Sequence, residues 1–164
     1  MTVRKTRNLN LRVPTAEEYL AFDGAHCRGI YRALLEDWAC PGCGRSKFQI
    51  LRWTLLFPKL PGRHEGWAGG YHSHHDHGAD GLLGSPPKAL RVPPRFERIV
   101  ICEQCNTADG TAKKKLGLPP QFSFSPSEIR TFVRSTAHGF HDVDYEMAHR
   151  IYRQLSPSGS LNEA

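Results

Sequence analysis

The chain has 164 residues, of which 39% are hydrophobic, and it carries a formal net charge of +6. This length suits one domain with a modest core, and the positive charge favours an anionic partner, most commonly nucleic acid. The sequence contains no apolar run long enough to span a membrane and no apolar segment after Met1 typical of a signal peptide, so we expect an intracellular protein without a membrane partner.

The N-terminal part, residues 1–38, is expected to be a basic arm followed by two short helices. Thr15 and Glu18 form a capping box that predicts a helix over residues 16–22. Gly24 ends this helix, and apolar side chains four positions apart predict a second one over residues 25–36.

Four of the five cysteines occur as two Cys-x2-Cys pairs, formed by Cys40 with Cys43 and by Cys102 with Cys105. This spacing indicates one closed, tetrahedral zinc site of four thiolates rather than disulfides, and its role is structural. Cys27 lies outside the pattern and is interpreted as a half-buried thiol.

The segment between the two cysteine pairs contains the histidine-rich stretch. We predict a strand over residues 48–57, a loop over 58–70, an extended segment over 71–77, a loop over 78–94 and a strand over 96–101. Successive residues of an extended chain face opposite sides, so His74 and His75 point to the two sides of a strand. One imidazole can then hold a divalent cation while the other acts as a general base in phosphodiester hydrolysis.

The C-terminal part is expected to be helical. A helix is predicted over residues 106–116, with Asn106 at the capping position and Gly117 at its end. Ser125 and Glu128 form a second capping box, which predicts a helix reaching residue 137, and a last helix is expected over residues 143–155.

The histidine stretch and the second cysteine pair together resemble a known family. The residues that carry the resemblance are His72-Ser73-His74-His75-Asp76-His77 and Ile101-Cys102-Glu103-Gln104-Cys105-Asn106-Thr107-Ala108-Asp109-Gly110. In this order, after the first cysteine pair, the chain is similar to the recombination endonuclease VII branch of the HNH nucleases over residues 40–116. The resemblance implies a ββα-metal core and cleavage of DNA to 5′-phosphate and 3′-hydroxyl ends.

Residue roles follow from the resemblance position by position. His75 stands where the family has its general base, and His77 matches the second histidine of the motif. His74 and Asn106 stand where it has an Asp and an Asn that bind the catalytic cation, and His74 departs from that pattern. The colicin-type branch of the superfamily uses a His-His pair, so the departure is compatible with activity. A second register, with Asp76 as ligand and His77 as base, stays open.

The sequence therefore predicts an α+β protein with a small ββα-metal core and a four-cysteine zinc knuckle over residues 39–118. Helices flank this core over residues 1–38 and 119–164. The predicted function is a metal-dependent DNA endonuclease that uses structural Zn²⁺ and a catalytic Mg²⁺, Mn²⁺, Co²⁺ or Ni²⁺. The predicted phosphate contacts come from Lys113, Lys114, Lys115, Arg91, Arg95 and Arg98.

Two alternatives remain at this point. The chain can be a non-catalytic zinc-ribbon module that binds nucleic acid or protein, or it can act as a homodimer or inside a larger phage or restriction assembly. Nothing in the sequence indicates readout of particular bases.

Overall fold

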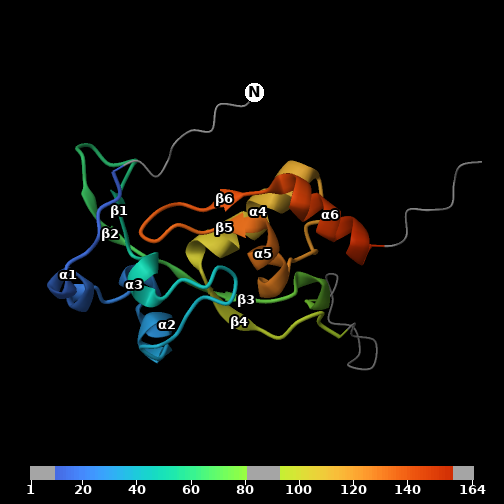
Figure 1. Cartoon of the computed structure of the whole chain (residues 1–164), viewed down its shortest axis with the longest axis horizontal. Helices are drawn as coiled ribbons and strands as arrows, with labels where there is room; N and C mark the ends of the chain where they lie inside the picture. Colours follow the sequence, from blue (N-terminus) through green and yellow to red (C-terminus); the bar gives the residue numbers. More distant parts are fainter. Residues whose placement is uncertain (1–9, 81–92, 157–164) are drawn as a thin grey trace, which may run out of the picture.

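The computed structural model describes residues 10–80 and 93–156. Over these residues it combines helices with three two-stranded antiparallel sheets, which confirms a mixed helix and strand protein (Figure 1).

The N-terminal helices are short. The first, α1 (Ala16–Ala21), begins at the predicted capping box, in which the Thr15 side chain accepts from the Glu18 backbone and the Glu18 side chain accepts in return. The predicted helix over residues 25–36 is a 3₁₀ turn, η1 (Ala25–Cys27), followed by α2 (Arg28–Ala33). It ends early because Leu34 adopts an extended conformation.

The prediction of a strand over residues 48–57 is wrong in its first part. Ser46 and Gln49 form a capping box that the sequence reasoning overlooked, and it starts the helix α3 (Lys47–Ile50). The strand β1 (Arg52–Leu55) follows and pairs with β2 (Glu65–Ala68), which lies inside the predicted loop. Trp53 and Trp67 face each other across this pair with their rings 5.2 Å apart, a contact that favours strand pairing.

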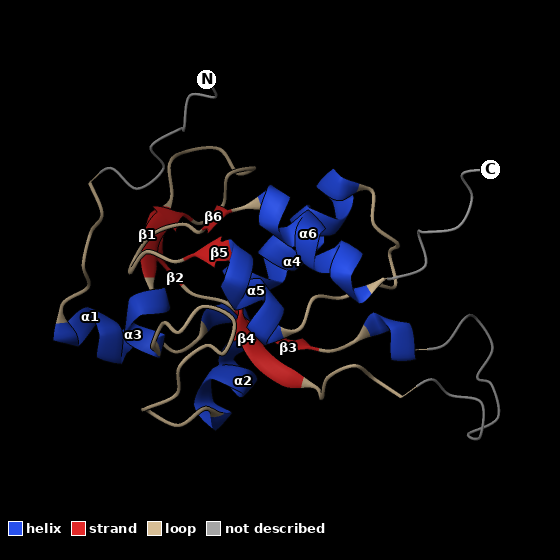
Figure 2. Ribbon diagram, turned by 45° about the vertical axis from the view of Figure 1, so that its right-hand side comes forward, coloured by secondary structure: helices blue, strands red, loops and turns tan. Residues whose placement is uncertain are grey.

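The predicted site lies on a second antiparallel pair, β3 (Tyr71–His74) with β4 (Ile99–Cys102). The helix α4 (Glu103–Leu116) follows β4 without a loop (Figure 2). Cys102 caps α4, so the helix begins three residues before the predicted start and Asn106 lies inside it. The strand β3 ends at His74 because the Asp76 side chain accepts from the Gly78 backbone and begins a 3₁₀ turn, η2 (His77–Ala79).

The C-terminal part adds two helices and a short hairpin. The helix α5 (Pro126–Phe132) begins at the predicted capping box of Ser125, and α6 (Tyr145–Leu155) ends the described chain. The prediction that α5 reaches residue 137 is wrong, because residues from Val133 onward form β5 (Val133–Arg134), which pairs with β6 (Asp142–Val143). The helices α4, α5 and α6 pack on one another.

The core joins all three predicted segments. Tyr71, Ile101, Phe124, Ile129 and Phe132 are almost fully buried in one cluster, which also contains Cys40, Cys102 and Cys105. Partly buried side chains from the N-terminal part, among them Ile30 and Trp38, pack against this cluster. Within the described ranges, no helix has the length and apolar character that a membrane span requires.

Candidate functional site

The two predicted cysteine pairs meet in space. The ligand atoms of Cys40, Cys43, Cys102 and Cys105 all lie within 4.8 Å of one another. The Sγ atoms of Cys40 and Cys105 are 3.8 Å apart, as are those of Cys43 and Cys102. Thiolates at 2.3 Å from a tetrahedral zinc ion would stand about 3.8 Å from one another. The donor set and its spacing therefore fit a structural zinc site, which we call the cysteine cluster.

The backbone around the first pair forms a tight turn that aims both sulfur atoms at the second pair. The Cys40 carbonyl accepts from the backbone of Cys43 at 3.2 Å and of Gly44 at 2.6 Å. Gly44 has a positive φ of 75°, a conformation that favours glycine. The Cys40 Sγ also accepts from the Cys102 backbone at 3.2 Å, so the first pair lies directly against the start of α4.

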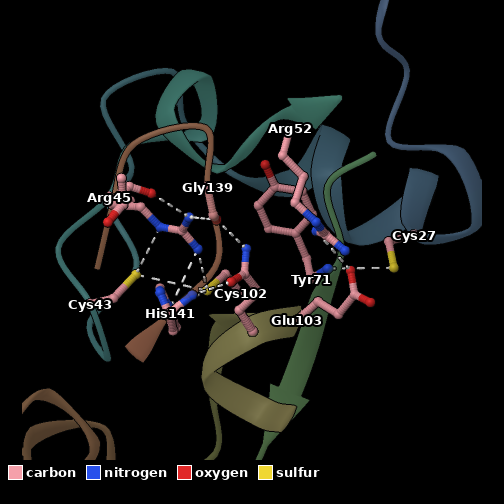
Figure 3. Close-up of polar contacts among 11 residues, drawn as sticks. Cys27, Cys43, Arg45, Arg52, Tyr71, Cys102, Glu103, Gly139 and His141 are labelled. Carbon is pink, nitrogen blue, oxygen red and sulfur yellow. Dashed lines mark hydrogen bonds and ion pairs between the residues drawn. The ribbon is translucent and has the colours of Figure 1, made fainter. Parts of the chain in front are cut away.

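Two basic side chains that the sequence reasoning missed lie against the cysteine cluster (Figure 3). Arg45 is buried and lies 3.5 Å from both the Cys43 and the Cys102 sulfur atoms. His141, in the β5–β6 hairpin, places Nε2 3.4 Å from the Cys105 sulfur. Hydrogen bonds from Cys105 and then Cys40 lower the pKa of Cys102 to about 5. If the cluster holds a metal ion through thiolates it carries negative charge, and these basic groups would offset that charge.

The predicted catalytic histidines lie at the end of β3, where His74 is buried. Its Nε2 donates to the Phe124 carbonyl at 2.7 Å, and its ring stacks on Phe96. This hydrogen bond fixes the tautomer and leaves the lone pair on Nδ1, which is how a metal-binding histidine is commonly held. Asn106 lies on the partly exposed side of α4, and within the described residues no hydrogen bond joins it to His74. Their pairing as cation ligands stays a prediction.

The alternative ligand, Asp76, is engaged by the backbone. Its Oδ1 accepts from Gly78 at 3.1 Å and its Oδ2 from Arg95 at 2.8 Å. Only 6% of the residue is exposed. Both oxygens therefore already stabilise the turn after β3, and coordination of a cation by Asp76 would compete with these hydrogen bonds.

His75 and His77 come together with Asp80, a residue that the sequence reasoning left in a loop. The Asp80 Oδ2 lies 2.9 Å from His75 Nε2 and 3.0 Å from His77 Nδ1. The hydrogen bond from His75, followed by that from His77, holds the pKa of Asp80 below its usual value. We call these three residues the His-Asp triad. The spacing of His77 and Asp80 could have indicated this contact, because two residues three positions apart lie side by side on a helical turn.

The predicted phosphate-binding residues differ in whether their charged groups already contact other side chains. Lys113 pairs with Asp109 at 2.9 Å, and the Lys115 ammonium lies 3.8 Å from the centre of the Tyr145 ring. Arg95 pairs with Glu128 and also donates to the Ser123 carbonyl. Arg98 makes a long contact of 3.4 Å with the Ser73 hydroxyl. Arg91 lies outside the described residues.

Lys114 is the lysine of this group without a polar partner in the described part of the chain. It lines a shallow surface hollow of about 760 Å³ on the exposed side of α4, together with Asn106, Thr107, Gly110, Thr111 and Lys115. The hollow therefore presents Lys114 and Lys115 beside the smaller side chains of α4.

The chain matches no known family model, and neither the curated proteins nor the solved structures give a significant match to it.

Proposed function

We propose that this protein is a metal-dependent DNA endonuclease of the HNH type. The support comes from the order of its parts: a strand that ends in histidines, a second strand, and a helix that begins at a cysteine pair. The cysteine cluster holds the start of that helix against residues 40–45, which fixes the strands and α4 relative to each other. The net charge of +6 is consistent with DNA as the substrate.

The observation that carries the proposal is the His-Asp triad at the turn that follows β3. The side chains of His77 and Asp80 are 45% and 50% exposed, so a phosphate group and water can reach them. A divalent cation, when bound at such a site, stabilises the negative charge on the leaving oxygen and lowers the pKa of nearby water. The chain itself contributes two imidazoles, which can accept a proton from water, beside a carboxylate that stabilises a protonated imidazole.

His75 and His77 are both candidates for the proton acceptor. The resemblance assigns this role to His75, whose Nε2 faces Asp80. The contact of His77 with Asp80 is through Nδ1, which leaves its Nε2 as the nitrogen with the lone pair when Nδ1 carries the proton. His77 therefore stays a candidate for the base, as in the second register. Asp76, the ligand in that register, instead accepts hydrogen bonds from the Gly78 and Arg95 backbones.

The test is cleavage of supercoiled plasmid by the zinc-loaded protein in the presence of a second divalent ion. We expect nicked or linear DNA, and we expect His75→Ala and His77→Ala to reduce the rate by at least tenfold. His64→Ala is the matched control, because His64 is exposed and its side chain contacts the Pro61 carbonyl on the β1–β2 connection. Linear, supercoiled and branched substrates would then define the preferred DNA structure.

The second candidate is the non-catalytic zinc-ribbon module. It is favoured by one observation: the cysteine cluster is assembled, whereas no hydrogen bond in the described residues joins His74 to Asn106. If the folded protein binds DNA but leaves it intact with Mg²⁺, Mn²⁺, Co²⁺ and Ni²⁺, the endonuclease proposal is wrong and the module is correct.

A further inference from the structure

We propose that His75, His77 and Asp80 bind one divalent transition-metal ion, in addition to the zinc of the cysteine cluster. The three side chains offer ligand atoms that all lie within 4.8 Å of one another. The two nitrogen–oxygen distances, 2.9 Å and 3.0 Å, meet at the same Asp80 oxygen. Ligands at about 2.1 Å from one ion stand roughly 3.0 to 3.4 Å apart, so small movements suffice to admit the ion.

The backbone of the turn is built to hold this geometry. Asp76 starts η2, and the Ala79 and Asp80 backbones donate to the Asp76 and His77 carbonyls at 3.2 Å and 3.1 Å. The His77 backbone donates to the Ser123 hydroxyl, and Asp76 also accepts from Arg95. The turn is therefore tied to the chain on both sides, to the segment before α5 and to the segment before β4.

The surroundings of His75 select one of its nitrogens. Nδ1 is buried without a hydrogen-bond partner in the described residues, while Nε2 points to Asp80. His75 therefore presents Nε2 alone to the triad. His77 lies beside it, with the ring centres 4.3 Å apart, and presents Nδ1 to the same point.

The donor types indicate the class of ion. Two imidazoles and one carboxylate suit Mn²⁺, Co²⁺, Ni²⁺ or Zn²⁺, whereas Mg²⁺ and Ca²⁺ prefer sites made of oxygen. Three protein ligands leave coordination positions open, and the exposed side of His77 and Asp80 makes them accessible to water or a phosphate oxygen.

This ion site differs from the pair that the resemblance implies. It replaces His74 and Asn106 by the His-Asp triad. Binding itself is independent of any reaction, whereas a role of this ion in cleavage rests on the proposed endonuclease function. In that case the loss of cleavage expected for His75→Ala and His77→Ala would come from loss of the ion, and neither histidine would be the proton acceptor while it binds the ion.

The experiment is calorimetric titration of the zinc-loaded full chain with Ni²⁺ and with Mn²⁺. We expect one further ion per chain for the unmodified protein. Asp80→Asn and His75→Ala should weaken its binding by at least tenfold. His64→Ala and Asn106→Ala should leave it unchanged. Zinc content and circular dichroism confirm that each variant is folded.

The outcomes separate the two proposals. Loss of the ion in Asn106→Ala with retention in Asp80→Asn would overturn the triad, as would the absence of a second ion in the unmodified protein. An ion bound by the triad in a protein that never cuts DNA would support the metal site and refute the endonuclease. Cleavage that survives Asp80→Asn, with the ion retained, would refute the metal site alone.

Discussion

Gly42 lies against the cysteine cluster more closely than a larger residue could. A β-carbon at this position would stand 3.0 Å from the Cys105 sulfur and 3.2 Å from its β-carbon. Both atoms belong to Cys105, which is fully buried, so they have little room to move. The space at Gly42 therefore sets how closely the first cysteine pair approaches α4.

We predict that Gly42→Ala destabilises the protein by about 1–3 kcal/mol, the usual cost of overpacking a well-packed site. Gly110→Ala is the matched control, because a β-carbon there meets nothing within 4 Å. Gly110 lies inside α4, so its replacement should stabilise by roughly 0.5–1 kcal/mol. Thermal unfolding of both variants tests this, and equal melting temperatures would contradict the role of Gly42.

A second prediction concerns the ligands themselves. Cys43→Ser should lose tightly bound zinc and unfold broadly, because binding of a structural metal is coupled to folding. Cys27→Ser is the control: Cys27 is outside the cluster, and its sulfur accepts a hydrogen bond from the Tyr71 backbone at 3.5 Å. Elemental analysis and circular dichroism report the outcome. A metal-free protein with unmodified Cys43 that stays fully folded would refute the structural role of zinc.

Among the elements, α4 has two distinct sides. Cys105, Ala108, Asp109 and Ala112 are buried, and the Asp109 carboxylate accepts from the Phe124 backbone at 2.8 Å. This contact ties α4 to the segment that also accepts the hydrogen bond of His74. The opposite side carries the shallow hollow with Lys114 and Lys115. One helix thus connects the cysteine cluster, the histidine strand β3 and the basic surface.

The three lysines at the end of α4 should therefore behave differently. Lys114→Ala should lower the slope of log affinity against log salt by about one, because one phosphate contact is lost. Lys113→Ala should mainly reduce stability, since Lys113 is 14% exposed and pairs with the buried Asp109. Binding to labelled duplex DNA at several salt concentrations, with thermal unfolding in parallel, distinguishes them. An unchanged slope for Lys114→Ala would place the DNA contact elsewhere.

Local signals in the sequence predicted some elements and missed others for identifiable reasons. The capping boxes at Thr15 and Ser125 predicted two helix starts, because those hydrogen bonds involve neighbours in sequence. The strand β2 was missed because its partner, β1, is what makes it a strand. The first residues of α4 were missed because Cys102 caps the helix without a side-chain hydrogen bond.

For the molecule as a whole, spacing predicted the cysteine cluster but not the residues around it. The two Cys-x2-Cys pairs can be recognised from their spacing alone. Arg45 and His141 come close to the sulfur atoms only when the chain is folded. The same holds for Asp80, whose role depends on the turn that Asp76 starts. The assignment of His74 and Asn106 to one cation came from the resemblance and remains a prediction.

The last prediction concerns the catalytic ion. If the protein cuts DNA, its rate with Mn²⁺, Co²⁺ or Ni²⁺ should exceed the rate with Mg²⁺, because imidazole ligands suit those ions better. Rates with each ion at saturating concentration provide the measurement. His74→Asp should shift the preference toward Mg²⁺ only if His74 holds the ion, and should leave it unchanged if the triad does. A higher rate of the unmodified protein with Mg²⁺ would contradict an imidazole-rich site.

The distance along the chain between the two cysteine pairs has a consequence for how the protein folds. Cys40 and Cys102 are 62 positions apart, so a metal held by the cysteine cluster would close a long loop, and closure of such loops slows folding. During synthesis the first pair emerges with only two thiolates, and its partners follow much later. Any nascent chain that ends before Cys102 therefore lacks half of the cysteine cluster, and a metal could secure the strands β1, β2 and β3 only after the start of α4 has been made.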